Sequence, residues 1–198
     1  MMTVRQIDKL WDSGAHSQLF RQMISGRPEA SPKLHPNLNG PIPAAAMALL
    51  RLDELTQSHA PIYRKLLLTI LNAQEADGGW GDPLITAVCL RALMAGRGQG
   101  QAIDMGLTYL ARLQKSSGLW PRGPIQRLAE DPLASALILI HLGSDERFRK
   151  AVNFGAAVRW FENNQTLLDP ETAKIWEHAS VRCHGRRMMM AEPVLNWS

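Results

Sequence analysis

Apolar residues recur every three or four positions along several long segments of the chain. In 61–74 these positions are Ile62, Leu66, Ile70 and Ala73, and in 101–113 they are Ile103, Leu107, Leu110 and Leu113. Residues with this spacing lie on one face of an α-helix. The pattern predicts amphipathic helices, each packing one face against the protein, over roughly 3–24, 61–74, 101–114 and 147–164.

A second kind of segment begins with Asp-Pro and continues with small and aliphatic residues. The pairs are Asp82-Pro83, Asp131-Pro132 and Asp169-Pro170. Aspartate at an N-cap accepts hydrogen bonds from free backbone N–H groups, and proline at the first helical position loses no bond. The small residues that follow these or similar starts are Thr86, Ala87, Ala92, Ser135, Ala136 and Ala44 to Ala46. We therefore predict buried inner helices that approach one another closely.

The two kinds of segment alternate in a repeat. "AQEADGGWGDPLITAVCLRAL" at 73–93 matches "LQKSSGLWPRG" at 113–123 followed by "EDPLASALILIHL" at 130–142. Weaker copies lie at 39–52 and 163–179; the latter keeps a glutamine and Asp-Pro but has no Gly-x-Trp. Gln74 and Gln114 are 40 residues apart, and Gln114 and Gln165 are 51 apart. This period is typical of stacked helix pairs.

These patterns predict an all-α fold of about four helical hairpins. The expected hairpins span roughly 3–57, 61–96, 101–142 and 147–184, and together they form one repeat domain over 1–184. No β-strand pattern competes with this assignment. The methionine-rich tail at 185–198 is expected to pack on its own domain, although a sticky peptide of this kind also suits docking on a neighbour.

"LLTILNAQEADGGW" at 67–80 and "LTYLARLQKSSGLW" at 107–120 resemble a motif known as QW. This repeat is similar to that of the terpenoid cyclase and protein prenyltransferase α/α-toroid superfamily, especially squalene–hopene cyclases. The resemblance covers roughly 40–184 and implies an α/α toroid. Because the chain supplies fewer hairpins than the family's rings use, we expect an incomplete or small toroid, or one completed by a second chain in a homo-oligomer.

The resemblance implies structural roles for the motif residues, with glutamine tying helix ends together and tryptophan stacking nearby. The residues themselves agree, because glycine permits a tight left-handed turn and a buried indole N–H needs a polar partner. The predicted structural residues are Gln74, Gly79, Trp80, Asp82, Gln114, Gly118, Trp120, Asp131, Gln165 and Asp169.

The catalytic residues of the family do not carry over. Its class II cyclases protonate an alkene with Asp-x-Asp-Asp-Thr-Ala, and the matching stretch here, Asp82 to Ala87, has Leu84 at the proton-donor position. Glu130-Asp131 lies one step out of register. A general acid of this kind needs a carboxylic acid in a tuned setting. We therefore predict that Asp82 and Asp131 are helix caps, and we expect no catalytic residue.

The sequence evidence for a metal site, a catalytic nucleophile or a phosphate site is equally weak. The family's zinc-binding prenyltransferases need Asp-x-Cys, but Ala87 precedes Cys89 and Val181 precedes Cys183. The set Glu177, His178, Cys183 and His184 is better explained as polar residues at a helix terminus than as a zinc site. "GRGQGQ" at 96–101 lacks the Lys-Ser/Thr of a phosphate loop and fits a helix cap and turn. No metal or cofactor is predicted.

Composition further narrows the classes of function to which the chain can belong. The 198 residues are 45% hydrophobic, and 22 Lys and Arg against 18 Asp and Glu give a mild net charge of +4 without a basic stripe, which argues against nucleic-acid binding. Two cysteines make no disulfide framework, and Cys89 fits a buried position. Without a signal-peptide core or an apolar run of membrane length, we expect a cytoplasmic protein without a membrane span.

Three functions fit these observations. The first is a non-catalytic toroid-like protein that binds an isoprenoid, a lipid or another apolar ligand in a groove lined by the inner helices. The second is a helical-repeat scaffold whose partner is another protein. The third, less favoured, is a terpene or prenyl enzyme completed by a partner chain. The sequence does not separate the first two.

Overall fold

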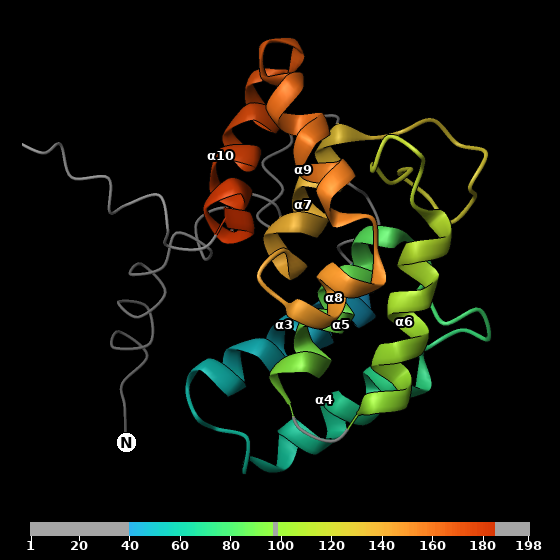
Figure 1. Cartoon of the computed structure of the whole chain (residues 1–198). Helices are drawn as coiled ribbons and strands as arrows, with labels where there is room; N and C mark the ends of the chain where they lie inside the picture. Colours follow the sequence, from blue (N-terminus) through green and yellow to red (C-terminus); the bar gives the residue numbers. More distant parts are fainter. Residues whose placement is uncertain (1–39, 97–98, 185–198) are drawn as a thin grey trace, which may run out of the picture. The chain divides into compact units, whose positions relative to one another are not determined.

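The computed structural model describes residues 40–96 and 99–184, and all regular elements in these ranges are helical (Figure 1). They are α3 (Pro41–Glu54), α4 (Pro61–Asn72), α5 (Pro83–Ala95), α6 (Gly100–Leu113), α7 (Pro132–Leu142), α8 (Glu146–Ala151), α9 (Phe154–Asn163), the 3-10 turn η2 (Gln165–Leu167) and α10 (Pro170–His184). The all-α prediction is confirmed. The predicted helix at 3–24 and the tail at 185–198 lie outside the described residues.

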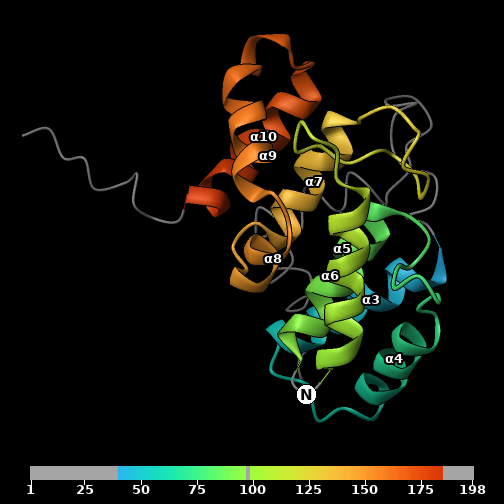
Figure 2. The same ribbon diagram turned by 45° about the vertical axis from the view of Figure 1, so that its right-hand side comes forward.

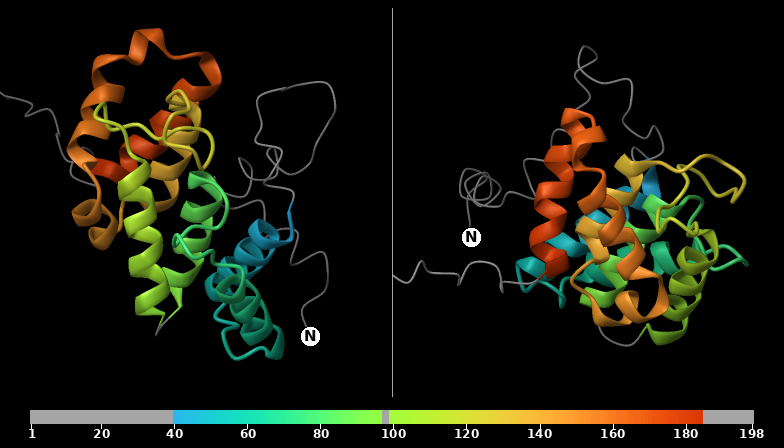
Figure 3. Two further views of the ribbon diagram at one scale, coloured as in Figure 1. Left: turned by 90° about the vertical axis from the view of Figure 1, so that its right-hand side faces the viewer. Right: turned by 45° about the horizontal axis from the view of Figure 1, so that its top comes forward.

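The helices divide into an inner set and an outer set, and the hairpins stack through contacts within and between these sets. The inner helices form a row in which α3 packs on α5, α5 on α7, and α7 on α10. The outer helices cover this row: α4 packs on α3, α6 on α5, and α9 on α10. Figure 2 shows α6 against α5, and the left view of Figure 3 shows α3 beside α4.

Inner helices α5, α7 and α10 run in the same direction, with their carboxyl ends together. The Arg91 guanidinium of α5 donates to the His141 carbonyl of α7 at 3.1 Å, and that of Arg182 in α10 donates to the Ile140 carbonyl at 3.1 Å. Burial, followed by the nearby Arg91 guanidinium, lowers the pKa of Arg182, and Glu54 near the end of α3 opposes this shift. Arginines at this end and capping aspartates at the other suit the aligned helix dipoles.

The inner helices form the core. Ten of the thirteen residues of α5 are buried, as are seven of the eleven of α7. Outer helix α6 buries the apolar face that its sequence predicts, including Ile103, Leu107 and Leu110. The corresponding prediction for α4 is only partly correct. Ile70 is buried, but Ile62 is 54% exposed.

The segment predicted as one helix over 147–164 is two helices. The first, α8, ends at Ala151, and α9 begins at Phe154 after Asn153, whose side chain accepts from the Ala156 N–H at 3.2 Å. Asparagine is a strong N-cap because its side-chain oxygen replaces a missing backbone acceptor. The spacing of apolar residues is nearly continuous across the break between α8 and α9. It therefore did not predict that a new helix begins after Asn153.

Ala46→Leu is expected to destabilise the fold by about 1–3 kcal/mol, because Ala46 is fully buried in α3, which packs on α5 and α4, and extra methyl groups there must displace neighbours. Ala48 is exposed on the same helix, so Ala48→Leu should change stability by less than about 0.5 kcal/mol. Urea unfolding followed by circular dichroism measures both variants. Equal effects would contradict the close packing of α3.

Candidate functional site

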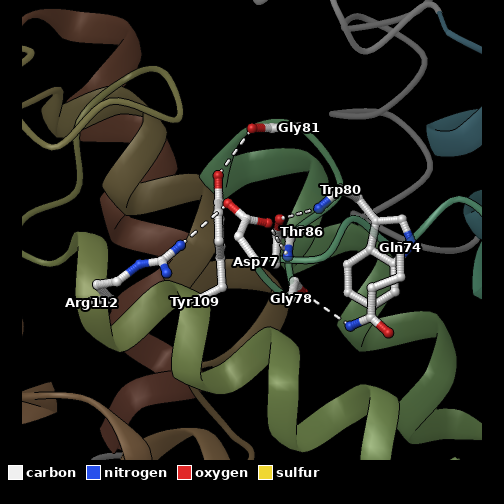
Figure 4. A network of polar contacts seen from close by, with 9 residues as sticks. Gln74, Asp77, Gly78, Trp80, Gly81, Thr86, Tyr109 and Arg112 are labelled. Carbon is white, nitrogen blue, oxygen red and sulfur yellow. Dashed lines mark hydrogen bonds and ion pairs between the residues drawn. The ribbon is translucent and has the colours of Figure 1, made fainter.

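The first glutamine–tryptophan motif lies in the glycine loop between α4 and α5, next to the start of the outer helix α6 (Figure 4). The Gln74 amide donates to the Gly78 carbonyl at 2.9 Å and to the Ala102 carbonyl at 2.9 Å. Gly78 belongs to the loop, whereas Ala102 is in the first turn of α6. One side chain therefore ties a hairpin loop to the helix of the next hairpin.

Trp80 ties the same loop to both of its own helices. Its indole N–H donates to the Ile70 carbonyl of α4 at 2.7 Å, and its backbone N–H donates to the Thr86 hydroxyl of α5 at 3.0 Å. Trp80 is only 4% exposed, so the indole N–H would be costly to bury without this partner. Gln74 and Trp80 together with their hydrogen bonds are called a staple below.

The second motif builds the same staple between α6, α7 and α9. Gln114 donates to the Gly118 carbonyl at 2.8 Å and to the Asn153 carbonyl at 3.2 Å, and its own amide oxygen accepts from the Asn153 N–H at 2.7 Å. The Trp120 indole donates to the Leu110 carbonyl at 2.8 Å, and its backbone N–H donates to the Ser135 hydroxyl at 2.9 Å. The partners correspond to those of the first staple, with serine in place of threonine.

Each staple requires a glycine in the left-handed region. Gly78 has φ +92° and Gly118 has φ +97°. A Cβ on Gly118 would lie 2.3 Å from the backbone nitrogen of Ala157, and one on Gly78 would lie 2.5 Å from the Met105 carbonyl oxygen. The equivalent of Gly118 in the first loop is thus Gly78, one residue before Gly79. The predicted Gly79 has a different constraint, because its Cβ would meet the Tyr109 ring.

A polar network around Tyr109 adds to the first staple, and the sequence pattern did not indicate it. The Tyr109 hydroxyl donates to the Gly81 carbonyl at 2.9 Å, and Arg112 lies over the Tyr109 ring while pairing with Asp77 at 3.2 Å (Figure 4). Burial, followed by the nearby Asp77 carboxylate, raises the pKa of the Tyr109 phenol. The phenol therefore stays protonated and serves as a hydrogen-bond donor.

The third copy of the motif does not form a staple. Gln165 lies in η2 after α9, is exposed, and makes no side-chain hydrogen bond within the part of the chain that the structure describes. Leu167 and Leu168 occupy the place of the glycine–tryptophan loop, and Leu167 is 79% exposed. Trp176 of α10 instead stacks on Phe161 of α9 with ring centroids 4.5 Å apart. Stacked aromatic rings thus join this last hairpin.

All three Asp-Pro aspartates cap helices. The Asp82 carboxylate accepts from the Ile85 N–H at 2.9 Å, and that of Asp131 accepts from the Ala134 N–H at 3.0 Å. Asp169 accepts from the backbone of Thr172 and, at 2.7 Å, from its hydroxyl. Asp82 is 2% exposed, and Leu84, at the proton-donor position of the resemblance, is 1% exposed. This geometry supports capping rather than acid catalysis.

The cysteines and histidines in the described part of the chain do not converge on one site. Cys89 and Cys183 are both buried; burial raises the pKa of each thiol, that of Cys183 to about 12, so neither is a thiolate nucleophile at neutral pH. His184 bonds the Ser180 carbonyl and, at 3.1 Å, the Glu162 carboxylate. Over residues 40–96 and 99–184, no three His, Cys, Asp or Glu side chains come together as metal ligands.

One open hollow lies beside the first staple. It has a volume of about 360 Å³ and is lined by Gln74, Gln99, Gly100, Gln101, Ala102 and Met105. Gln99 precedes α6, and Gly96 caps the end of α5, so the glycine-rich stretch at 96–101 includes the predicted helix cap. Three of the six lining side chains are amides, so the hollow is too polar to match an isoprenoid or lipid tail.

Comparison with protein-family models, with curated proteins and with solved structures found no match to this chain. Among the described helices, none is long and apolar enough to cross a membrane. The geometry of the chain itself is therefore the basis for any assignment of function.

Gln114→Ala is expected to cost about 1–3 kcal/mol, because two hydrogen bonds to Asn153 at the start of α9 and one to Gly118 within the loop are lost together. Gln165→Ala is the matched control and should change stability by less than about 0.5 kcal/mol, since Gln165 is exposed. Thermal unfolding at fixed pH compares them. A smaller loss for Gln114→Ala than for the control would overturn the assigned tie.

Gly118→Ala is expected to destabilise the protein by at least about 2 kcal/mol, because the new Cβ meets the backbone of α9 and the residue must keep a positive φ. Gly100→Ala is the control: its Cβ meets nothing within 4 Å, and alanine favours the helix. Chemical denaturation gives both free energies. Similar stabilities for the two variants would show that the loop relaxes without cost.

Proposed function

We propose that this chain is a non-catalytic helical-repeat scaffold that binds another protein. The observation that carries the proposal is the use of the motif's polar groups within the fold. Gln74, Gln114 and the two indole N–H groups bond backbone carbonyls, and Asp82 and Asp131 cap helices. A catalytic acid or base must instead face a substrate. The bonding pattern that the two staples share thus supports a structural role.

Burial of the small residues favours the scaffold over an apolar-ligand site. Ala46, Ala87 and Ala92 are 0–1% exposed, so they form close contacts between helices instead of lining a surface groove. Large hydrophobic side chains are exposed elsewhere, on α4 and on the segment after Trp120. A protein partner can cover such separate positions, whereas a small apolar ligand needs a concave, mostly apolar pocket.

Kinship with the terpenoid cyclase and protein prenyltransferase superfamily is part of this proposal, as an incomplete or small α/α toroid. Two staples with the same bonding pattern and a row of inner helices support it. An enzyme completed by a partner chain receives less support, because Leu84 holds the proton-donor position and Asp82, the remaining acid of the motif, caps α5. A cytoplasmic location also belongs to the proposal, and the two free, buried cysteines are compatible with it.

Native mass spectrometry of the full chain, purified from its source cells, tests the proposal. We expect a complex with another protein chain and no small-molecule adduct. A monomer that retains an apolar adduct would contradict the scaffold and favour the ligand-binding function.

Asp82→Asn with Asp131→Asn serves as a companion variant, because asparagine caps helices about as well as aspartate but cannot donate a carboxylic proton. The complex should survive both substitutions with an affinity within about threefold of the native value, since a change in capping alone costs little binding energy. An activity that disappears with these substitutions while the fold remains would identify an enzyme.

A further inference from the structure

The two staples differ in one respect, which is the length of chain between the tryptophan and the aspartate cap. In the first staple a single residue, Gly81, separates Trp80 from Asp82. In the second, ten residues, 121–130, separate Trp120 from Asp131. The hydrogen bonds of the indole, of the threonine or serine hydroxyl and of the capping aspartate are nevertheless the same in the two staples. The repeat therefore folds without the extra residues.

The inserted loop 121–130 leaves the staple and returns to the same place. The Asp131 N–H donates to the Trp120 carbonyl at 2.9 Å, and Pro121 and Glu130 form a backbone bridge. The loop appears in yellow in Figure 1, extending from the start of α7. Compact loops with adjacent ends are frequent functional elements, and insertions in repeat proteins often form the binding face.

Hydrogen bonds tie the loop to the staple residues before it and close a turn within it. The Ser117 hydroxyl donates to the Glu130 carboxylate at 2.7 Å, and the Lys115 ammonium donates to the Gln126 carbonyl. The Leu128 N–H closes a turn onto the Ile125 carbonyl at 3.0 Å. A loop ordered before it binds loses less conformational entropy on association.

The ordered loop presents apolar side chains to solvent. Ile125 is 57% exposed and Leu128 is 43% exposed, although the staple of the first repeat needs no such residues. Arg127 is exposed beside them, whereas Arg122 pairs with Asp131 at 3.9 Å and Glu130 accepts from Ser117, so these three charges are engaged within the chain. The tip is thus apolar and basic.

We propose that loop 121–130 is the site at which this scaffold binds its partner protein, through an apolar pocket on the partner rimmed by carboxylates. Ile125 and Leu128 enter the pocket, and Arg127 pairs with its acidic rim. This inference rests on the proposed scaffold function and adds the contact site and the chemistry of the partner surface. An apolar interface core with a polar rim and complementary charges is typical of such contacts.

The chain supplies its own control for testing this site. Replacing 121–130 by one glycine recreates the Trp-Gly-Asp connection of the first repeat. We expect this variant to keep its helical content and to lose the partner seen by native mass spectrometry. Retention of the complex by the folded variant would overturn the loop proposal while leaving the scaffold function intact, and failure of the native chain to bind any protein would overturn both.

Site-specific photo-crosslinking gives a second readout. A photoreactive amino acid replaces Leu128 in the full chain, and the control replaces Leu68 of α4, which is similarly exposed at 46%. We expect a crosslink from position 128 to a partner peptide that contains both apolar residues and Asp or Glu, and none from position 68. A crosslink that forms mainly from position 68, or no crosslink at all, would contradict the assignment. A crosslink from position 128 to a peptide without acids, to lipid or to nucleic acid would contradict it as well.

Charge reversal tests the rim once the crosslinked partner has been purified. Arg127→Glu should weaken binding by about tenfold or more, because the acidic rim then meets a like charge. The variant should also remove part of the salt dependence of binding, since salt screens the attraction between opposite charges across an interface. Lys150→Glu is the control, since Lys150 is an exposed cation paired with Glu146 on α8. Equal weakening by the two variants would show that net charge, rather than the loop, governs binding.

Discussion

The glutamine side chain that bridges one hairpin loop to the next outer helix is the interaction on which this structure depends. A helical hairpin cannot bury its apolar face alone, so the array is stable only if successive hairpins hold a fixed register. Gln74 joins the loop after α4 to α6, and Gln114 joins the loop after α6 to α9. The indoles then fix each loop to its own helices. Close packing of the inner helices follows from this register.

The ties also explain why the motif residues are poorly suited to chemistry. The indole N–H groups bond carbonyls near the ends of α4 and α6, and the glutamine amides bond carbonyls of the loops and of Ala102 and Asn153 at the starts of α6 and α9. The aspartates satisfy the first N–H groups of the inner helices. At the opposite ends, Arg91 and Arg182 bond the last carbonyls of α7. Polar groups in the stapled part of the fold are thus used to satisfy the backbone, and surfaces outside the staples remain available for binding.

Local signals in the sequence were sufficient to predict much of the fold. Asp-Pro pairs marked the starts of α5, α7 and α10 because capping depends on adjacent residues, and the glutamine–glycine–tryptophan spacing located both staples. Long-range partners were not predictable. Neither the Tyr109 hydroxyl bond to Gly81 nor the arginine contacts have a sequence period. In the third copy, Gln165 keeps only the glutamine before Asp-Pro, and no outer helix that it could bond follows it within the described residues.

Hydrogen exchange of the tryptophan indoles, followed by NMR, tests the structural role of the motif most directly. We expect the Nε1–H groups of Trp80 and Trp120 to exchange only when the whole protein unfolds, with protection close to the global free energy of unfolding. Trp160, which is less buried, provides the internal comparison. Exchange of Trp80 and Trp120 as fast as that of Trp160 would show that the loops open independently, and would contradict the staples as the ties that hold successive hairpins together.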